Sequence, residues 1–132
     1  MIRVRHLAKH YGDTVVLRDV NAEIRKGEVV SIIGPSGTGK STFLRCLNLL
    51  EQPTSGSIEI DGQDVLAPST DVARLRQRMN MVFQSFNLFS HLSVLENLTL
   101  APIRLRGANK PDAERRAHEL LRMVGLAEKA SN

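Results

Sequence analysis

The spacing of apolar residues at the N-terminus predicts two β-strands joined by a tight turn. Apolar residues alternate weakly with polar ones over residues 2–9, and a similar alternation returns over residues 14–24. The turn residues Tyr11-Gly12-Asp13 separate the two segments. Because the connection is short, we expect the two strands to be antiparallel, with an irregularity in the second near Asn21.

A third segment, residues 28–33, has a different pattern. It is apolar at consecutive positions rather than at alternate ones, and the tight connection Lys26-Gly27 leads into it. A strand that is apolar on both faces is typical of the centre of a parallel sheet that helices cover on both sides. We therefore expect residues 28–33 to form a buried central strand.

Helical periodicity begins directly after residue 39. Four apolar residues predict the buried face of a helix that ends at the turn residues 53–56: Phe43, Leu44, Leu47 and Leu50. Cys46 lies at the edge of this face, which favours a small buried hydrophobe over a reactive thiol. Residues 57–62 then alternate and end in Asp61-Gly62, which is a hairpin signal.

The remaining pattern predicts three helices and one short strand. Asp71 can cap a helix through Met79, and residues 80–83 have the pattern of a strand. Ser93 or Ser90 can cap a second helix, which we expect to run through Ala101 and to stop at Pro102.

The last helix begins at residues 111–114, where a proline and two acids occupy the first turn. We expect it to end with Gly125 as its C′ residue. Its apolar stripe consists of Ala113, Ala117, Leu120, Leu121 and Val124.

Residues 34–42, between the third strand and the first helix, fit the phosphate-binding pattern G-x-x-x-x-G-K-[ST] in the strand–loop–helix context that the pattern requires. Three glycines lack a Cβ, so the backbone can take positive φ and turn its N–H groups around a phosphate: Gly34, Gly37 and Gly39. Lys40 can reach the β- and γ-phosphates, and the Ser41 hydroxyl can ligate Mg²⁺. The alternative is a plain glycine-rich turn, and the order of the elements favours a nucleotide phosphate site.

Composition narrows the class of protein. With 42% hydrophobic but only 4% aromatic residues, aliphatic side chains must fill the core of a 132-residue chain, a normal size for one domain. The net charge of +4 favours anionic partners, but acids are interspersed with the bases, which argues against nucleic acid. No apolar run approaches the ~20 residues of a membrane span. The single cysteine excludes an internal disulfide and favours a reducing compartment, so we expect a cytoplasmic protein.

Beyond the loop, an ordered set of motifs resembles the ATP-binding subunits of ABC transporters, most closely those of polar amino-acid importers. The motifs are His10-Tyr11-Gly12, Gly27-Glu28-Val29-Val30, Leu44-Arg45-Cys46-Leu47-Asn48, Gly56-Ser57-Ile58, Met81-Val82-Phe83-Gln84, Asn87-Leu88-Phe89, Val94-Leu95-Glu96-Asn97 and Leu100-Ala101-Pro102. The resemblance implies an α/β fold with a P-loop NTPase-type core, an N-terminal antiparallel β-subdomain and the start of a helical subdomain. Residues 1–84 would form the first part and residues 85–132 the second.

The resemblance also implies roles for single residues. Tyr11 would stack on adenine, although a half-buried turn tyrosine is the alternative that its local sequence favours. Gln84 would ligate Mg²⁺ or orient water, the alternative being an exposed loop glutamine. The residues implied to contact Mg-ATP are Tyr11, Gly34, Pro35, Ser36, Gly37, Thr38, Gly39, Lys40, Ser41, Thr42 and Gln84, with Ser41 and Gln84 on the metal.

Implied partners are a second copy of the ATP-binding subunit and a membrane permease, which would place the protein on the inner face of the cell membrane. Residues 86–100 would contact the permease, while Phe86, Leu88 and Phe89 could equally be local core. Ser90 stands where relatives often have proline, and Thr38 where they often have serine.

The sequence contains no LSGGQ signature, no Asp-Glu strand end and no switch histidine, so it resembles the N-terminal half of such a subunit. Without those groups we assign no catalytic residue and expect weak Mg-ATP binding with negligible turnover. An unpaired edge at residues 28–33 would make the isolated chain marginally stable or prone to associate. Two alternatives are a permease-docking fragment that does not use nucleotide, and a small kinase that shares only the phosphate loop. A kinase would need acidic and arginine residues arranged as a lid, whereas the charge pattern around Arg115 and Arg116 is typical of a surface helix.

Overall fold

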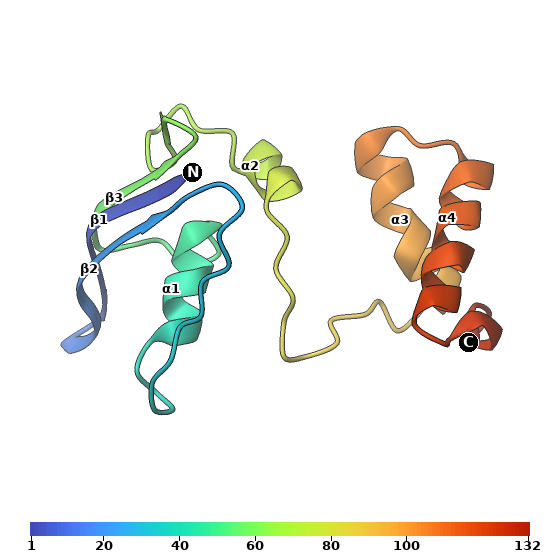
Figure 1. The fold of residues 1–132 in the computed structure, drawn as a ribbon, viewed down its shortest axis with the longest axis horizontal. Helices are drawn as coiled ribbons and strands as arrows, with labels where there is room; N and C mark the ends of the chain where they lie inside the picture. The colour runs from blue at the N-terminus through green and yellow to red at the C-terminus, as the bar shows by residue number, and fades with distance from the viewer. The chain divides into compact units, whose positions relative to one another are not determined.

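The computed structural model describes residues 1–132 and divides them into two compact units, Met1–Met81 and Val82–Asn132. The first unit contains a four-stranded antiparallel sheet in the order β2-β1-β3-β4 (Figure 1). The strands are β1 (Ile2–Tyr11), β2 (Thr14–Ile24), β3 (Ser55–Ile60) and β4 (Gln63–Asp64). The predicted early strand pair and the Asp61-Gly62 hairpin are both confirmed.

The strand pair is irregular opposite Asn21, as predicted, but the extra residue lies in β1 and not in the second strand. Val4 pairs with Ala22 and Leu7 with Val20, so three steps along β1 are matched by two along β2. The extra residue forms a bulge in which His6 has a φ of 49°. The side chain of Asn21 replaces the missing ladder bond, because its Oδ1 accepts from the His6 N–H at 2.9 Å.

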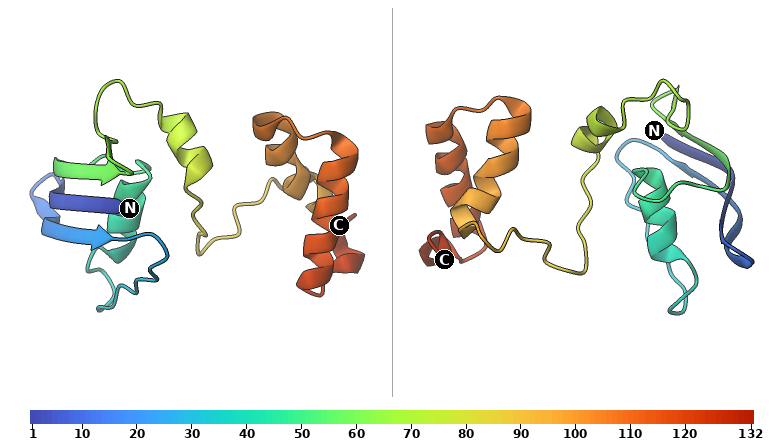
Figure 2. Two further views of the ribbon diagram at one scale, coloured as in Figure 1. Left: turned by 45° about the horizontal axis from the view of Figure 1, so that its top comes forward. Right: turned by 180° about the vertical axis from the view of Figure 1, so that it is seen from behind.

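Helix α1 (Lys40–Leu47) covers one face of the sheet (Figure 2), and α2 (Val72–Arg78) adds Leu75 to the same core. The predicted face of α1 was partly wrong, because Leu44 and Leu50 are half-exposed. The core consists of Val4, Leu7, Leu17, Phe43, Cys46, Leu47, Ile58, Ile60, Val65 and Leu75.

Cys46 lies in the centre of the buried face of α1 rather than at its edge. Together with Phe43 and Leu47 it occupies positions i, i+3 and i+4, whereas Leu50 lies beyond the end of the helix. The side chain is fully buried, and this burial raises the pKa of its thiol. The interpretation of Cys46 as a buried hydrophobe is confirmed.

Residues 28–33 do not form the central strand that their apolar run predicts. They are irregular, and Val29 and Ile33 are 96% and 93% exposed. A strand needs a neighbour that pairs with its N–H and C=O groups, and the sheet does not include this segment. The prediction was wrong because an apolar run shows only that a segment could be buried. Burial as a strand also requires a neighbouring strand, and this structure does not provide one. Residues 80–83, also predicted as a strand, are irregular for the same reason.

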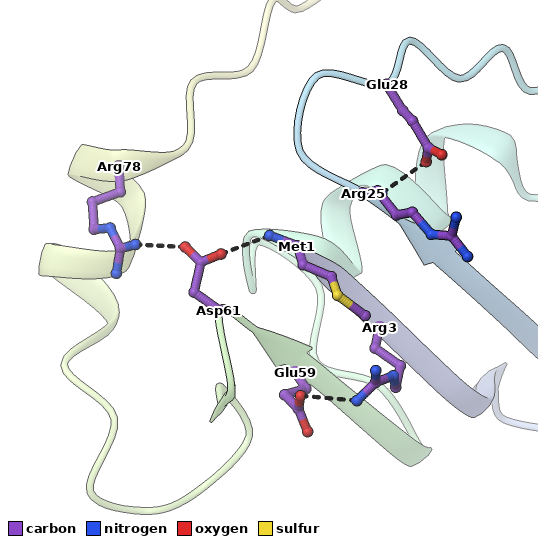
Figure 3. A network of polar contacts seen from close by, with 7 residues as sticks. All are labelled: Met1, Arg3, Arg25, Glu28, Glu59, Asp61 and Arg78. Atoms are coloured by element: carbon purple, nitrogen blue, oxygen red, sulfur yellow. Dashed lines mark hydrogen bonds and ion pairs between the residues drawn. The ribbon is translucent and has the colours of Figure 1, made fainter.

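Asp61 connects three parts of the first unit (Figure 3). Its carboxylate accepts from the Met1 α-amino group at 2.6 Å and from the Arg78 guanidinium at 2.9 Å. The hydrogen bond from the amino group, followed by its charge and by that of Arg78, lowers the pKa of Asp61. These contacts hold α2 against the turn between β3 and β4. The predicted cap Asp71 is confirmed, since it accepts from the Arg74 N–H.

The second unit consists of α3 (Val94–Arg106), α4 (Lys110–Met123) and a short 3-10 helix (Ala127–Lys129). The predicted stop at Pro102 was wrong, because α3 continues through it to Gly107, which is left-handed with a φ of 66°. A proline removes only one N–H donor, and the capping box of Ser93 and Glu96 stabilises the start of the same helix. None of the helices has both the length and the hydropathy of a membrane-spanning segment.

The buried side of α4 is narrower than the predicted stripe. Ala113, Ala117 and Leu121 are buried, whereas Leu120 and Val124 are exposed. The predicted helix start and the left-handed Gly125 after the C-cap Val124 are confirmed.

Candidate phosphate-binding site

The glycines of residues 34–42 have different roles. Gly37 and Gly39 have φ values of 80° and 89°, as expected for a loop that turns its N–H groups inward. The expectation of positive φ was wrong for Gly34. A Cβ there would lie 3.2 Å from the Thr38 Oγ1, so this glycine permits close approach within the loop rather than an unusual backbone angle.

Gly39 also sets the position of α1 against the sheet. A Cβ on Gly39 would lie 2.9 Å from the Leu17 Cδ2 and 3.0 Å from the carbonyl oxygen of Val16. Glycine therefore allows the first turn of α1 to begin directly on β2. The backbone of the phosphate loop is thus positioned by the core of the first unit.

The N-terminus of α1 has no side-chain cap, which distinguishes it from the other α-helices. Asp71, Ser93 and Asn109 cap α2, α3 and α4 through their side-chain oxygens. No side chain accepts from the first turn of α1, and this turn contains no acidic residue. A helix leaves its first N–H groups without intrahelical partners, and together with the helix dipole they attract an anion.

Lys40 places a positive charge on the same loop. Its Nζ donates to the carbonyl oxygens of Gly34 at 2.7 Å and of Pro35 at 2.5 Å, and it lies 3.3 Å from the Thr38 Oγ1. The Thr38 hydroxyl donates to the Pro35 oxygen at 2.8 Å. These bonds keep the ammonium group at the loop, while the Ser41 side chain stays exposed.

Tyr11 lies at the end of β1, next to the first turn of α1, and is 45% exposed. Partial burial raises the pKa of its hydroxyl, and a hydrogen bond with the Glu51 carboxylate raises it further. A hydrogen bond with Thr42 acts in the opposite direction. The first unit therefore brings Tyr11 together with the helix that follows the phosphate loop. Gln84 belongs to the second unit, where it lies on irregular chain before α3.

A cavity of about 660 Å³ lies between β2, residues 30–35 and α1. Its lining includes Thr38, Gly39 and Lys40 from the loop, but is otherwise mostly aliphatic. The unpaired apolar segment before the loop therefore borders an apolar hollow. Residues 1–132 contain no group of three or more His, Cys, Asp or Glu side chains arranged so that they could hold a metal ion.

The aromatic residues before α3 are exposed rather than local core. Phe86 is 93% exposed, and Leu88 and Phe89 are more than half exposed. The rings of Phe89 and His91 form a T-shaped pair with centroids 5.9 Å apart. These residues are available for contact with a partner.

Sequence patterns did not identify Asn97 as the residue that shapes this loop. Its Oδ1 accepts from the Phe89 N–H at 2.9 Å. Its Nδ2 donates to the carbonyl oxygens of Phe89, Leu92 and Ser93. The sequence did contain one sign of this role, because Asn97 is an asparagine inside a helical pattern, one turn after the cap Ser93.

Comparisons with known proteins agree with this geometry. The family model described as "ABC transporter" matches residues 17–132. The chain is 54% identical over 130 residues to the glutamine transport ATP-binding protein GlnQ of Escherichia coli (strain K12) and 48% identical over 132 residues to the arginine transport ATP-binding protein ArtM of Bacillus subtilis (strain 168). These alignments cover 98% and 100% of this chain but 54% and 55% of the relatives, so the chain spans about half their length.

Solved structures are similar over the whole chain. A dimeric bacterial ABC transporter cassette, MJ0796, aligns with a TM-score of 0.85 at 38% identity. A post-hydrolysis dimer of the same cassette bound to ADP and Pi aligns with a TM-score of 0.83 at 37% identity. Each alignment covers 100% of this chain and 60% of the other.

Proposed function

This chain belongs to the ABC transporter family, and from that premise we propose that it binds Mg-ATP as part of the energising subunit of a polar amino-acid importer. The motif resemblance and the α/β fold predicted from it are confirmed by the family match and by the solved cassettes. The two relatives described above are named as ATP-binding proteins of glutamine transport and of arginine transport. Those names support an amino-acid substrate for the assembly to which this chain contributes.

The uncapped N-terminus of α1 is the observation that carries the nucleotide proposal. Three helices are capped by their own side chains, whereas the helix after the glycine-rich loop leaves its first N–H groups available. Lys40 adds a positive charge to the same loop. A phosphate chain would supply the acceptors and the negative charge that this site lacks.

We assign the remaining contacts by residue. Tyr11 receives the adenine base, and Gln84 provides an amide oxygen for Mg²⁺ or for water. The Ser41 hydroxyl oxygen fits Mg²⁺, which prefers oxygen ligands and usually binds with few protein groups. When bound, Mg²⁺ neutralises charge between the phosphates. The phosphate cradle consists of Gly34, Pro35, Ser36, Gly37, Thr38, Gly39, Lys40, Ser41 and Thr42.

Calorimetry with millimolar Mg-ATP tests this proposal. We expect measurable heat for the wild type, and at least a tenfold loss of affinity for Lys40→Ala. Lys110→Ala is a matched control because Lys110 is an exposed lysine on α4, and it should leave the affinity unchanged. A folded wild-type chain that gives neither heat nor a shift in melting temperature would refute nucleotide binding.

ATP hydrolysis is a separate question. The 132 residues contain neither an LSGGQ segment nor an Asp-Glu pair, so we expect negligible turnover by this chain alone. The measurement is phosphate release by the purified chain at saturating Mg-ATP. Release above that of Lys40→Ala would contradict this expectation.

A permease-docking fragment that does not use nucleotide is the second candidate. The exposure of Phe86, Leu88 and Phe89 favours it, because these apolar side chains form part of residues 86–100 and are available to a partner helix. Co-purification with the permease is the assay. Capture that Lys40→Ala leaves unchanged, from a chain that binds no Mg-ATP, would favour this candidate over the first.

A second copy of the subunit remains a proposed partner of the nucleotide-bound form.

A further inference from the structure

Lys9, two residues before Tyr11 on β1, is an unusually enclosed lysine. Only 14% of its side chain is exposed. Its Nζ donates to the Gln52 carbonyl oxygen at 2.7 Å and lies 3.6 Å from the Glu51 Oε2. Lysine is rarely buried unless it is paired, so these contacts indicate a defined position for the ammonium group.

The same ammonium group lies against the ring of Tyr11, 4.8 Å from its centroid. This distance is within the range of a cation–π contact. The carboxylate of Glu51, which pairs with Lys9, also acts on the Tyr11 hydroxyl and raises its pKa. Lys9 therefore contacts the face of the Tyr11 ring, and Glu51 pairs with the ammonium group that makes this contact.

This arrangement leaves the two faces of the ring in different surroundings. Lys9 is enclosed, so the face that it contacts is the inner one. Tyr11 is still 45% exposed, so part of the side chain remains accessible on the surface that Lys9 does not cover. Because Lys9 occupies one face of the ring, a planar base would have to stack on the opposite face.

We propose that Lys9 and Glu51 are positioning residues that hold the ring of Tyr11 ready to stack on the base of a nucleotide. This inference rests on the proposed nucleotide function, and it goes further by assigning the inner contacts of the base-binding side chain. An ordered ring loses less conformational freedom when the base binds. The contacts of Lys9 and Glu51 should therefore raise the affinity for the base and not for the phosphates.

Tyr11 is the only tyrosine, and the chain has no tryptophan. Its fluorescence is therefore a specific probe of this side chain in the full chain. The ligands are Mg-ATP and Mg-tripolyphosphate, which has the phosphates without a base. The variants are Lys9→Met, Lys9→Arg and the exposed control Lys110→Met.

In the wild type, we expect Mg-ATP to quench Tyr11 emission and to bind more tightly than Mg-tripolyphosphate. Lys9→Met should weaken Mg-ATP binding by about 3- to 10-fold and leave Mg-tripolyphosphate unchanged. Lys9→Arg should restore most of the affinity, because a guanidinium also stacks on an aromatic face. Lys110→Met should behave as the wild type.

A measurement without ligand tests independently whether Lys9 restricts the motion of the Tyr11 ring. Lys9→Met should lower the fluorescence anisotropy of Tyr11 and increase its quenching by acrylamide. Far-UV circular dichroism checks that the variant is folded. If it is not, Glu51→Gln replaces it, since this change removes the charge that pairs with Lys9 and should show the same changes.

The outcomes separate the two hypotheses. Equal weakening of both ligands by Lys9→Met, or unchanged anisotropy and affinity, would overturn the positioning role and leave nucleotide binding intact. A wild type that binds both ligands equally, without quenching, would overturn base stacking on Tyr11. Loss of both ligands in Lys40→Ala would then show that the phosphate site itself is real.

Discussion

Substitution of Gly56 by alanine should separate β1 from β3. Gly56 lies in β3 with a φ of 99°, a conformation that side chains rarely adopt. Its Cβ would lie 2.5 Å from the His6 carbonyl oxygen and 2.6 Å from the Leu7 Cα. Both atoms belong to the backbone and cannot rotate away. Because Cβ contacts under 3.0 Å are essentially never observed, the strands must move apart by at least 0.5 Å, the difference between 3.0 and 2.5 Å.

The expected loss of stability follows from these distances. The left-handed backbone alone costs about 1–2 kcal/mol for a residue with a Cβ. Moving β3 away also disturbs the pair Ala8–Ser55 and the 2.8 Å bond from the Thr54 N–H to the Ala8 oxygen. At about 1 kcal/mol for this hydrogen bond, the total is roughly 2–3 kcal/mol. That is a large part of the roughly 5–15 kcal/mol that stabilises a typical domain.

Gly62→Ala is the matched control. Gly62 also has a positive φ, of 80°, but no atom lies within 4 Å of the added Cβ. It should lose only the roughly 1–2 kcal/mol of backbone strain. Urea unfolding followed by Tyr11 fluorescence reports on the first unit alone, because Tyr11 is the only tyrosine. If Gly56→Ala is no less stable than Gly62→Ala, the strand-separation argument is wrong.

Three further predictions concern the exposed segment and the second unit. The unpaired residues 28–33 should make the wild-type chain associate. The double variant Val29→Lys/Ile33→Lys should sediment as a monomer. A monomeric wild type that unfolds reversibly would contradict this prediction. Hydrogen bonding from the Ser93 backbone, then from its side chain, lowers the pKa of Glu96. The stabilisation from this ionised cap should be complete above the ordinary value of 4.5 and should disappear as pH falls through the lower folded value. Helix content measured by circular dichroism from neutral to acid pH should show this loss. The loss of helix content should be smaller in Glu96→Gln. An identical pH profile in the variant would exclude the Glu96 cap as the cause of the loss. Asn97→Ala removes the partner of Phe89 and should lower the stability of the second unit by about 1–3 kcal/mol, measured by thermal unfolding, and an unchanged melting temperature would refute that role.

Local features were predictable because the residues that determine them are close together in sequence. A capping side chain bonds an N–H two or three positions later, so Asp71 and Ser93 were identifiable as caps without knowledge of the fold. The turn at Asp61-Gly62 was identifiable for the same reason. The phosphate-loop motif was also readable directly, since its glycines, lysine and serine are contiguous.

Tertiary structure decided the features that need a distant partner. Residues 28–33 have the composition of a buried strand, but the neighbouring strand and the helices that would bury it must come from other parts of the chain. In this structure residues 28–33 remain exposed. The contact of Lys9 with Tyr11 and Glu51 depends on the packing of the end of β1 against the loop after α1. The amino-acid sequence by itself therefore determined which segments bend, begin helices and can hold a phosphate, because those properties depend on neighbouring residues. Only the three-dimensional packing decided which apolar segment is covered and which ring is held in place, because those properties depend on contacts between residues far apart in the chain.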